Sequence, residues 1–460
     1  MRSFIWAQET TSKRLANARL APDSSTIKFR LYEQSEGAGE LKLLAKGSAS
    51  NLGSSESSSL SIKSFDPPAE ASDSTDAGSH AEAFKALIAL MEKKTSLLTN
   101  ITTVGHRVVH GGLKYSTPLL LTDKAIEQLD ELSDLAPLHN HPSVMLIKAA
   151  VEMKHLEGAK HVAVFDTAFH RTMPEMAWRY PLPYDDCDKG GVRKFGFHGT
   201  SYSYVSKCVA KHLSRSLESL NLIILHLGNG ASACAIRNGV SIDTSMGFTP
   251  LEGLMMGTRC GDIDASVPRH LDVCHGDDVP AVKADPNGPK ISREEEVLNR
   301  ESGLKGVCGD SDLQKVVKRA ESGDQRAELA LAMFCVSSRQ SPFGAFLKFS
   351  EMPNFLLQYR IVKYVGAYHA AIGGAHALVF TGGIGEHSAE VRARVCRGLE
   401  CIGIKVDEKK NKDCKVGDKV EEISTGVGVQ VLVVATDEEG EIARVAAECL
   451  KKGDKDSEGA

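Results

Sequence analysis

Residues Leu222–Asp264 read LIILHLGNGASACAIRNGVSIDTSMGFTPLEGLMMGTRCGDID, and this stretch combines an apolar run, a glycine loop and a hairpin signal. The apolar residues Leu222–Leu225 lead into HLGNG at 226–230, a pattern typical of a buried strand that enters a glycine loop. Residues Ala231–Thr244 alternate apolar and small side chains around Asn238-Gly239. This dipeptide suits a two-residue hairpin turn because both central positions favour positive φ. We therefore predict a strand, a glycine loop and a hairpin.

The same stretch carries the residue types of an anion site. Glycines at 228 and 230 let the backbone approach a phosphate closely, and Asn229 can donate a hydrogen bond. Downstream, GTRCGDID places Arg259 among glycines and two carboxylates. A plain turn would also explain Gly-Asn-Gly, and a surface ion pair would explain Arg259 alone. The density of glycine, serine and threonine across the whole stretch favours anion binding.

Length and composition limit the class of protein. A chain of 460 residues exceeds what one hydrophobic core usually fills, so two domains are expected. The net charge of −5 and the scattered lysines and arginines exclude a nucleic-acid-binding surface. Eleven cysteines without a Cys-x-x-Cys pair fit reduced thiols in the cytoplasm. No apolar segment is long enough for a signal peptide or a membrane helix, so neither membrane nor nucleic acid is an expected partner.

Hydrophobic periodicity predicts alternating strands and helices along the chain. The expected strands are 26–32, 161–166, 222–225, 377–380 and 429–435, and the expected helices are 81–97, 143–153, 201–214, 388–399 and 440–451. Residues 1–20 show no clear pattern. The serine-rich residues 47–80 are predicted to be a loop or a disordered insert, and the tail 451–460 is predicted to be disordered.

Several polar motifs follow the predicted strands. GHRVVHGG at 105–112 holds two histidines and an arginine, which are costly to bury without partners. A strand ending at Asp166 places a carboxylate where α/β folds often hold catalytic groups, although a helix cap explains it equally well. TGGIGE at 381–386 is predicted to be a glycine loop between a strand and a helix, which is the setting of a phosphate cradle. TDEE at 436–439 precedes a helix and suits either Mg²⁺ or the helix N-terminus.

Taken in order, these motifs resemble those of the acetate kinase family, within the superfamily of acetate and sugar kinases, heat-shock ATPases and actin. The matching pieces run from residue 104 to residue 443. They are GHRVVHGG, APLHNHP, VFDTAFHRTMPE, FGFHGTS, HLGNGAS, DTSMGFTPLEGLMMGTRCGDID, VFTGGIGEHS and TDEE.

The resemblance implies a role for each matching residue. Arg107 and Arg259 would hold the carboxylate and the transferring phosphoryl group, and His198 would stabilise the phosphoryl oxygens. Asp166 would orient the acetate or the metal region, and Glu438 would bind Mg²⁺. A small apolar pocket for the methyl group and a further active-site histidine are also implied: Val109, Leu138, Phe197 and Pro250, with His139. The nucleotide side would use Lys28, His226, Leu227, Gly228, Asn229, Gly230, Asp312, Leu313, Gln314, Gly382, Gly383, Ile384, Gly385 and Glu386.

The chain departs from the family pattern in three places. The family begins with an apolar strand that enters Asn-x-Gly-Ser-Ser-Ser-x-Lys, whereas this chain has no clear strand there and reads APDSSTIK at 21–28. Alanine replaces the asparagine and Asp23 replaces the glycine. An Asn-Ala pair at 17–18, out of register, indicates an erroneous start of the gene model. Gln314 also stands where the family has arginine.

The third departure is an insert. Residues 336–358, VSSRQSPFGAFLKFSEMPNFLLQ, interrupt what the family forms as one continuous helix. They fit a retained intron, because Val-Ser, Pro-Asn and Gln can be encoded by a donor site, a branch point and an acceptor site. A genuine loop is the alternative.

The resemblance implies two actin-like (ribonuclease H-like) α/β domains with mixed sheets and an active site in the cleft between them. Residues 1–166 with 440–460 would form the first domain, and 167–439 the second. The expected reaction is reversible phosphoryl transfer from ATP to acetate, giving ADP and acetyl phosphate, with Mg²⁺, in a cytoplasmic homodimer. Alternatives are a propionate or butyrate kinase, a non-catalytic nucleotide-binding relative, and a kinase with another phosphate donor such as pyrophosphate.

Overall fold

The chain folds into two compact units. The computed structural model describes residues 13–20, 26–34, 41–52, 57–271, 276–281, 288–334, 360–417 and 419–458. Unit 1 contains the described residues of 1–165, 280–289 and 438–460, and unit 2 contains those of 166–279 and 290–437. The described residues of 280–289 cluster with unit 1, whereas the sequence analysis assigned this range to the second domain.

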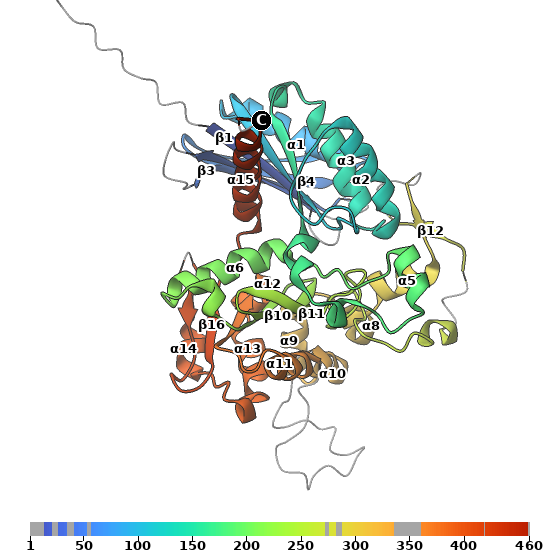
Figure 1. Ribbon diagram of the computed structural model, residues 1–460, viewed down its shortest axis with the longest axis vertical. Coiled ribbons are helices and arrows are strands. Elements are labelled where there is room, and N and C mark those ends of the chain that lie inside the picture. Colours follow the sequence, from blue (N-terminus) through green and yellow to red (C-terminus); the bar gives the residue numbers. More distant parts are fainter. Residues whose placement is uncertain are drawn as a thin grey trace, which may run out of the picture. The chain divides into compact units, whose positions relative to one another are not determined.

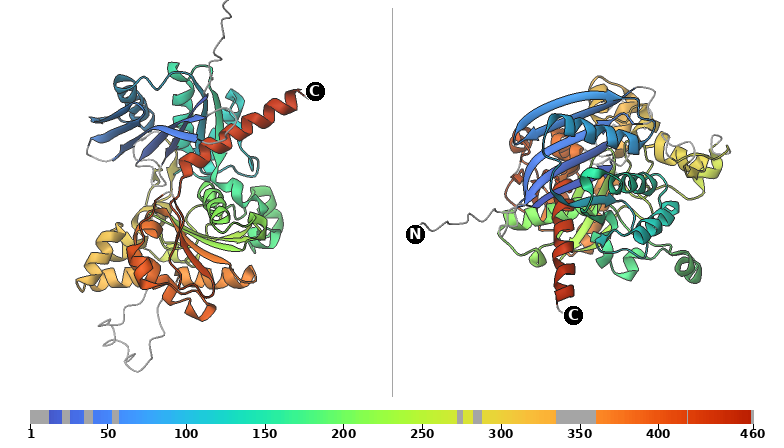
Figure 2. Two further views of the ribbon diagram at one scale, coloured as in Figure 1. Left: turned by 90° about the vertical axis from the view of Figure 1, so that its left-hand side faces the viewer. Right: turned by 90° about the horizontal axis from the view of Figure 1, so that it is seen from above.

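An eight-stranded mixed sheet forms the centre of unit 1. Its strand order is β5-β4-β3-β2-β1-β6-β8-β7, with β1, β6 and β8 parallel to one another and the remaining neighbours antiparallel. The strands are β1 (Lys13–Leu20), β2 (Ile27–Gln34), β3 (Leu41–Ser50), β4 (Ser58–Phe65), β5 (Pro68–Thr75), β6 (Ile101–Val108), β7 (Leu119–Leu120) and β8 (Lys160–Phe165). Figure 2 shows the antiparallel strands as one curved layer.

Helices cover both faces of this sheet (Figure 1). On one face, Phe84 and Leu87 of α1 and Leu146 of α3 share a core with the inward side chains of β2, β3 and β4. On the other face, Ile442 and Ala446 of α15 pack against β8. The helices are α1 (His80–Lys94), α2 (Asp123–Glu131), η1 (Leu132–Leu135), α3 (Asn140–Val151), η2 (Lys154–Leu156) and α15 (Glu438–Glu458).

Three predictions for unit 1 were wrong. The serine-rich residues 47–80 are mostly strands, because serines alternate with apolar residues at period two and Leu60 and Ile62 point into the core. A strand does precede residue 21, since β1 pairs with both β2 and β6, and this pairing overrides a weak local pattern. The predicted disordered tail continues α15 to Glu458, because extending an existing helix costs little.

Unit 2 is built on a six-stranded mixed sheet with the order β11-β10-β9-β14-β16-β15. The predicted hairpin around Asn238-Gly239 is confirmed, and both residues have positive φ. The strands are β9 (Leu222–Leu227), β10 (Ala231–Arg237), β11 (Val240–Thr244), β14 (Ala377–Thr381), β15 (Glu421–Glu422) and β16 (Gln430–Val433). A separate ribbon pairs β12 (Val279–Pro280) with β13 (Lys290–Ile291).

Helices also cover both faces of the second sheet. Val205 and Val209 of α6 pack on Leu222 and Ile224, while α11 contacts β9 and β10 from the other face (Figure 1). The helices are η3 (Asp166–Thr172), α4 (Glu175–Trp178), α5 (Tyr184–Gly190), α6 (Gly199–His212), η4 (Leu217–Ser219), η5 (Val267–His270), α7 (Arg293–Glu296), η7 (Val297–Glu301), α8 (Gly303–Cys308), α9 (Leu313–Glu321), α10 (Gln325–Phe334), α11 (Arg360–Ala371), α12 (Gly382–His387), α13 (Ala389–Arg397), η9 (Glu400–Ile402) and α14 (Glu408–Asp413).

The two sheets repeat one topology. Three antiparallel strands continue into two parallel ones in the order β3-β2-β1-β6-β8 in unit 1 and β11-β10-β9-β14-β16 in unit 2. This duplication confirms the predicted pair of actin-like α/β domains with mixed sheets. Among the described residues, no helix is long and apolar enough to cross a membrane. Residues 21–25 and the predicted insert 336–358 lie outside the described ranges.

Candidate active site

The glycine loop of unit 2 connects β9 to β10. The loop consists of Gly228–Gly230, and Gly228 N donates a hydrogen bond across it to Gly230 O (2.9 Å). From a separate segment, Gly257 N donates to Asn229 O (3.1 Å). Directly after the neighbouring parallel strand β14, Gly382 has φ +78° and lies so close to Leu227 O that a Cβ would be 2.7 Å from it. The loop, the segment around Gly257 and the start of α12 therefore meet at the carboxyl ends of parallel strands, where α/β folds bind ligands.

Two buried cationic or polar side chains converge on this loop. A Cβ placed on Gly230 would lie 3.5 Å from both Arg259 Nη1 and His198 Nε2. The side chains of both residues are buried. An imidazole and a guanidinium that approach the same glycine supply hydrogen-bond donors for an oxyanion in a site of low dielectric. The structure thus brings together Gly230, His198 and Arg259, three of the residues that the resemblance assigns to the site.

His198 is held in a defined orientation. It directly precedes α6 with a left-handed backbone (φ 57°), and its Nδ1 lies 2.8 Å from Ser232 Oγ. Ser232 Oγ also forms a short hydrogen bond with Tyr202 Oη. The ring of His198 stacks on His226 with centroids 4.2 Å apart, and His226 Nδ1 lies 2.8 Å from Ser201 Oγ. Ser232 and Tyr202 were missed by the sequence analysis, because only the fold brings α6 beside β10.

Asp166 and Phe197 lie on adjacent segments at the start of η3 and of α6. Asp166 is fully buried, and its carbonyl oxygen would be only 2.0 Å from a Cβ on Gly199. His170 joins the two segments, since its Nε2 bonds Phe197 O and its Nδ1 bonds Ser241 Oγ, each at 2.9 Å. Burial lowers the pKa of His170 to about 4, so its ring is neutral near pH 7. Pro250 is buried in the turn region that follows β11.

The other predicted nucleotide residues of unit 2 have visible structural roles. Asp312 caps α9 by accepting from Gln314 N (2.9 Å), and both side chains are exposed. Ser311 O lies near Gly257, which places this cap beside the glycine loop. Glu386 Oε1 accepts from Gly382 N and from Thr436 N, each at 3.0 Å. Residues 382–386 form the short helix α12 where a glycine loop was predicted, so that detail was wrong.

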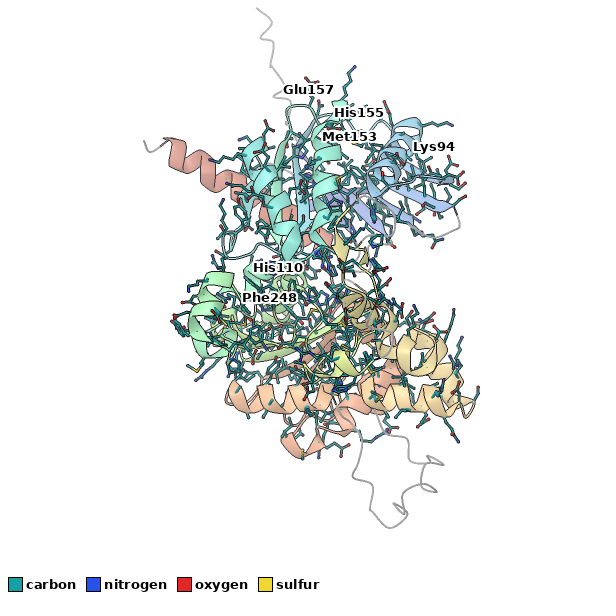
Figure 3. The ribbon with its side chains drawn as sticks, turned by 90° about the vertical axis from the view of Figure 1, so that its right-hand side faces the viewer. Lys94, His110, Met153, His155, Glu157 and Phe248 are labelled. Atoms are coloured by element: carbon teal, nitrogen blue, oxygen red, sulfur yellow. The ribbon has the colours of Figure 1, made fainter. Side chains whose placement is uncertain are left out.

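Part of the predicted acetate side lies in unit 1, at the end of β6. Arg107 and Val109 are buried, and the backbone just beyond them is fixed by Asn140. Asn140 Oδ1 accepts from His110 N and its Nδ2 donates to His110 O, both at 2.9 Å. Asn140 directly follows Leu138 and His139, so this contact joins the two predicted pocket segments. Figure 3 shows His110 at the opposite end of unit 1 from Met153, His155 and Glu157, which precede β8.

Lys28 and Glu438 complete the predicted residues of unit 1. Lys28 is exposed on β2. Glu438 is buried at the first turn of α15, where its neighbours Glu439 and Glu441 pair with Arg30 and Arg444. Within the described ranges, no group of three or more His, Cys, Asp or Glu residues could hold a metal. One buried carboxylate fits Mg²⁺, which proteins often bind through one or two carboxylates and the phosphates of a substrate.

The chain matches known proteins in sequence and in fold. The chain matches the sequence profile of the acetokinase family over residues 19–348 and 352–444. It is 46% identical over 369 residues to the acetate kinase of Sulfurovum sp. (strain NBC37-1), which covers 79% of this chain and 83% of the relative. The Porphyromonas gingivalis acetate kinase structure matches with a TM-score of 0.76 and 37% identity, covering 95% of this chain and 100% of the other. A propionate kinase from Francisella tularensis subsp. tularensis SCHU S4 matches with a TM-score of 0.78 and 32% identity, covering 95% and 99%.

Proposed function

The chain belongs to the acetokinase family, and we therefore propose that it transfers the γ-phosphoryl group of ATP to acetate, giving ADP and acetyl phosphate, and catalyses the reverse reaction. The observation that carries this proposal is the approach of His198 and Arg259 to the glycine loop at Gly230. Donors aimed at one point beside a glycine loop suit the oxygens of a phosphoryl group in transfer.

The chemistry asks little covalent work of the protein. An oxygen of the acetate carboxylate forms a bond to the γ-phosphorus, and the bond from that phosphorus to the bridging oxygen of ADP breaks. The carboxylate is already ionised at neutral pH, so no general base is required. Catalysis then rests on holding the two reactants in line and on stabilising the charge of the phosphoryl oxygens.

Each group of residues has a part in that task. Arg259 and His198 donate hydrogen bonds to the phosphoryl oxygens. Arg107 binds the acetate carboxylate and also the phosphoryl group during its transfer from ATP to acetate. Val109 and Leu138, together with Phe197 and Pro250, would enclose the methyl group, with His139 beside them. Asp166 orients the acetate or the metal region.

The nucleotide side is proposed from the family resemblance and the glycine loop. Residues 226–230, 312–314 and 382–386, with Lys28, would bind ATP. Glu438 would hold Mg²⁺, and the ion, when bound, neutralises charge on the phosphate oxygens. The homodimer is proposed from the resemblance alone. Light scattering on the protein as it elutes from a size-exclusion column measures its mass and so tests for the dimer.

The direct test is acyl phosphate formation from acetate, ATP and Mg²⁺, with hydroxylamine to trap the product. We expect a signal that depends on acetate, and a folded protein that binds ATP without forming product would contradict the proposal. Arg259→Lys should lower kcat about 100-fold, because an ammonium cannot replace a planar guanidinium at an oxyanion. Its control is Arg319→Lys, since Arg319 forms a surface pair with Asp324.

Two further measurements decide the substrates. Comparison of acetate, propionate and butyrate as acceptors separates an acetate kinase from the propionate kinase that the chain also resembles. Comparison of ATP with pyrophosphate as donor tests the effect of Gln314, which is exposed at the start of α9.

A further inference from the structure

The turn that carries Pro250 runs from Gly247 to Gly253, and other segments of unit 2 fix it at both ends. At its start, Gly247 O accepts two backbone hydrogen bonds, of 3.0 and 3.2 Å, from residues 195–196. At its end, Gly253 N donates to Asp262 Oδ1 (2.8 Å), and Gly253 O accepts from Asp262 N (2.9 Å). Pro250 is buried between these two fixed points.

The side chain of Tyr180 joins the two sides of this turn. Its hydroxyl accepts a hydrogen bond from Phe248 N (2.9 Å) and donates a short one to Glu252 Oε2. Burial raises the pKa of Tyr180, so the phenol keeps its proton and donates it to the carboxylate. A single hydroxyl therefore links the residue two positions before Pro250 to the residue two positions after it.

Lys194 and Gly247 complete the arrangement. Lys194 Nζ lies 3.4 Å from Glu252 Oε1 and donates to Thr244 O (3.1 Å). A Cβ on Gly247 would overlap both the Tyr180 hydroxyl and the Glu252 carboxylate, so glycine at this position lets the two side chains meet across the turn. We call the side chains of Tyr180, Glu252 and Lys194 the Pro250 brace.

The Pro250 brace makes the turn a stiff surface. An apolar pocket rejects an extra methylene only when its lining resists displacement, because overpacking forces side chains and backbone to shift. The ring of Pro250 fixes its own φ, and the brace holds the backbone on either side of it. Without the brace, the turn would move aside for a longer acyl chain at a lower energetic cost.

We propose that Tyr180 and Glu252 are specificity-determining residues that limit the length of the alkanoate that this chain phosphorylates. They act as positioning residues through Pro250, which encloses the methyl group under the proposed function, on which this proposal rests. The favoured acceptor is then a carboxylate with a single methyl group. Each further methylene presses against a surface that the Pro250 brace holds in place.

The test compares kcat/KM for acetate with kcat/KM for propionate in the wild type and in Tyr180→Phe. The variant keeps the ring and removes the hydrogen bonds to Phe248 and Glu252. One methylene in a fitted apolar pocket changes kcat/KM about 10- to 200-fold, and we expect the variant to lower the acetate-to-propionate ratio by about 3- to 10-fold. A loss of folded enzyme alone leaves this ratio unchanged, since both acids meet the same enzyme.

Tyr368→Phe is the control, because it removes a buried hydroxyl that has no hydrogen-bond partner among the described residues. It should keep the wild-type ratio. A Tyr180→Phe protein that also keeps the wild-type ratio would refute the role of Tyr180. A wild type that phosphorylates none of the acids would instead overturn the proposed function and this proposal with it, so the two failures are distinguishable.

Glu252 provides a second pair of variants. Glu252→Ala removes the acceptor of the Tyr180 hydroxyl and should lower the ratio as Tyr180→Phe does. Glu252→Gln keeps an oxygen for that hydroxyl and should keep the wild-type ratio, and a loss as large as that of Glu252→Ala would contradict the hydrogen-bonded brace. In the double variant, the change in the logarithm of the ratio should be smaller than the sum of the two single changes, because both residues share one contact. Additive changes would refute a shared role.

Hydrogen exchange tests the Pro250 brace without any activity. In Tyr180→Phe the amide of Phe248 should exchange faster than in the wild type, because its hydrogen bond to the phenol oxygen is lost. The amides of β9 (Leu222–Leu227) should keep their protection and so show that unit 2 remains folded. Unchanged exchange at Phe248 would refute the proposal that Tyr180 holds the turn.

Discussion

Replacing Asn140 by alanine should both destabilise unit 1 and weaken acetate binding. The Asn140 side chain is fully buried and makes two 2.9 Å hydrogen bonds to the backbone of His110, with a longer bond to Leu132 O. These bonds hold the turn after Val109 to the segment that carries Leu138. Alanine removes both bonds and leaves the His110 N–H and C=O without them in a buried place.

The expected size follows from those two groups. Each buried polar backbone group that loses its partner costs about 1 to 3 kcal/mol, so Asn140→Ala should lower the free energy of unfolding by about 2 to 6 kcal/mol. For a unit of this size, about 2 to 4 °C is lost per kcal/mol, which gives a fall in Tm of at least about 4 °C. The KM for acetate should rise while the KM for ATP stays the same, because the nucleotide residues belong mainly to unit 2.

Differential scanning calorimetry and initial rates at varied acetate measure the two effects. Asn299→Ala is the matched control, since this buried asparagine makes one side-chain hydrogen bond to the described residues, from its Nδ2 to Glu295 O. The control should lose about 1 kcal/mol and keep its KM for acetate. The proposal that Asn140 holds the turn after Val109 to the segment carrying Leu138 has two refuting outcomes. One is an Asn140→Ala protein that melts like the wild type, and the other is a protein that loses stability with no change in the KM for acetate.

Three further changes have defined outcomes. Gly257→Ala places a Cβ 2.1 Å from Asn229 Oδ1 and should raise the KM for ATP. The control is Gly366→Ala, which has open space around it and should leave the rates unchanged. A KM for ATP in Gly257→Ala equal to that of the wild type would count against a nucleotide role for Asn229. Burial lowers the pKa of His170 from about 6.5 to about 4 in the folded state. Between these pH values the unfolded state therefore binds more protons than the folded state. The free energy of unfolding should therefore fall by about 3 kcal/mol as the pH drops from 6.5 to 4. Urea unfolding measures this dependence on pH, and His170→Gln should reduce it. Deleting residues 336–358 should raise Tm, because the resemblance implies one continuous helix across this segment. An unchanged or lower Tm would refute the retained-intron interpretation.

The predictions that succeeded rest on short-range patterns. Asn238-Gly239 specifies its hairpin because both residues need positive φ, and the apolar run at Leu222 indicates a buried strand whatever lies beside it. Failures occurred where local composition and tertiary pairing disagree. β4 is rich in serine, yet Leu60 and Ile62 at period two bury one face, and β1 forms because it has a strand on each side.

Local motifs identified the chemistry of this protein, since a histidine, arginines and glycine loops can be recognised by type and order along the chain. Their orientation depends on contacts between segments far apart in sequence. Ser232 fixes His198 only because β10 lies beside the start of α6, and Asn140 holds His110 only because α3 begins beside the end of β6. Hydrogen bonds act over about 3 Å, so the partners of a buried side chain are decided by packing and not by distance along the chain.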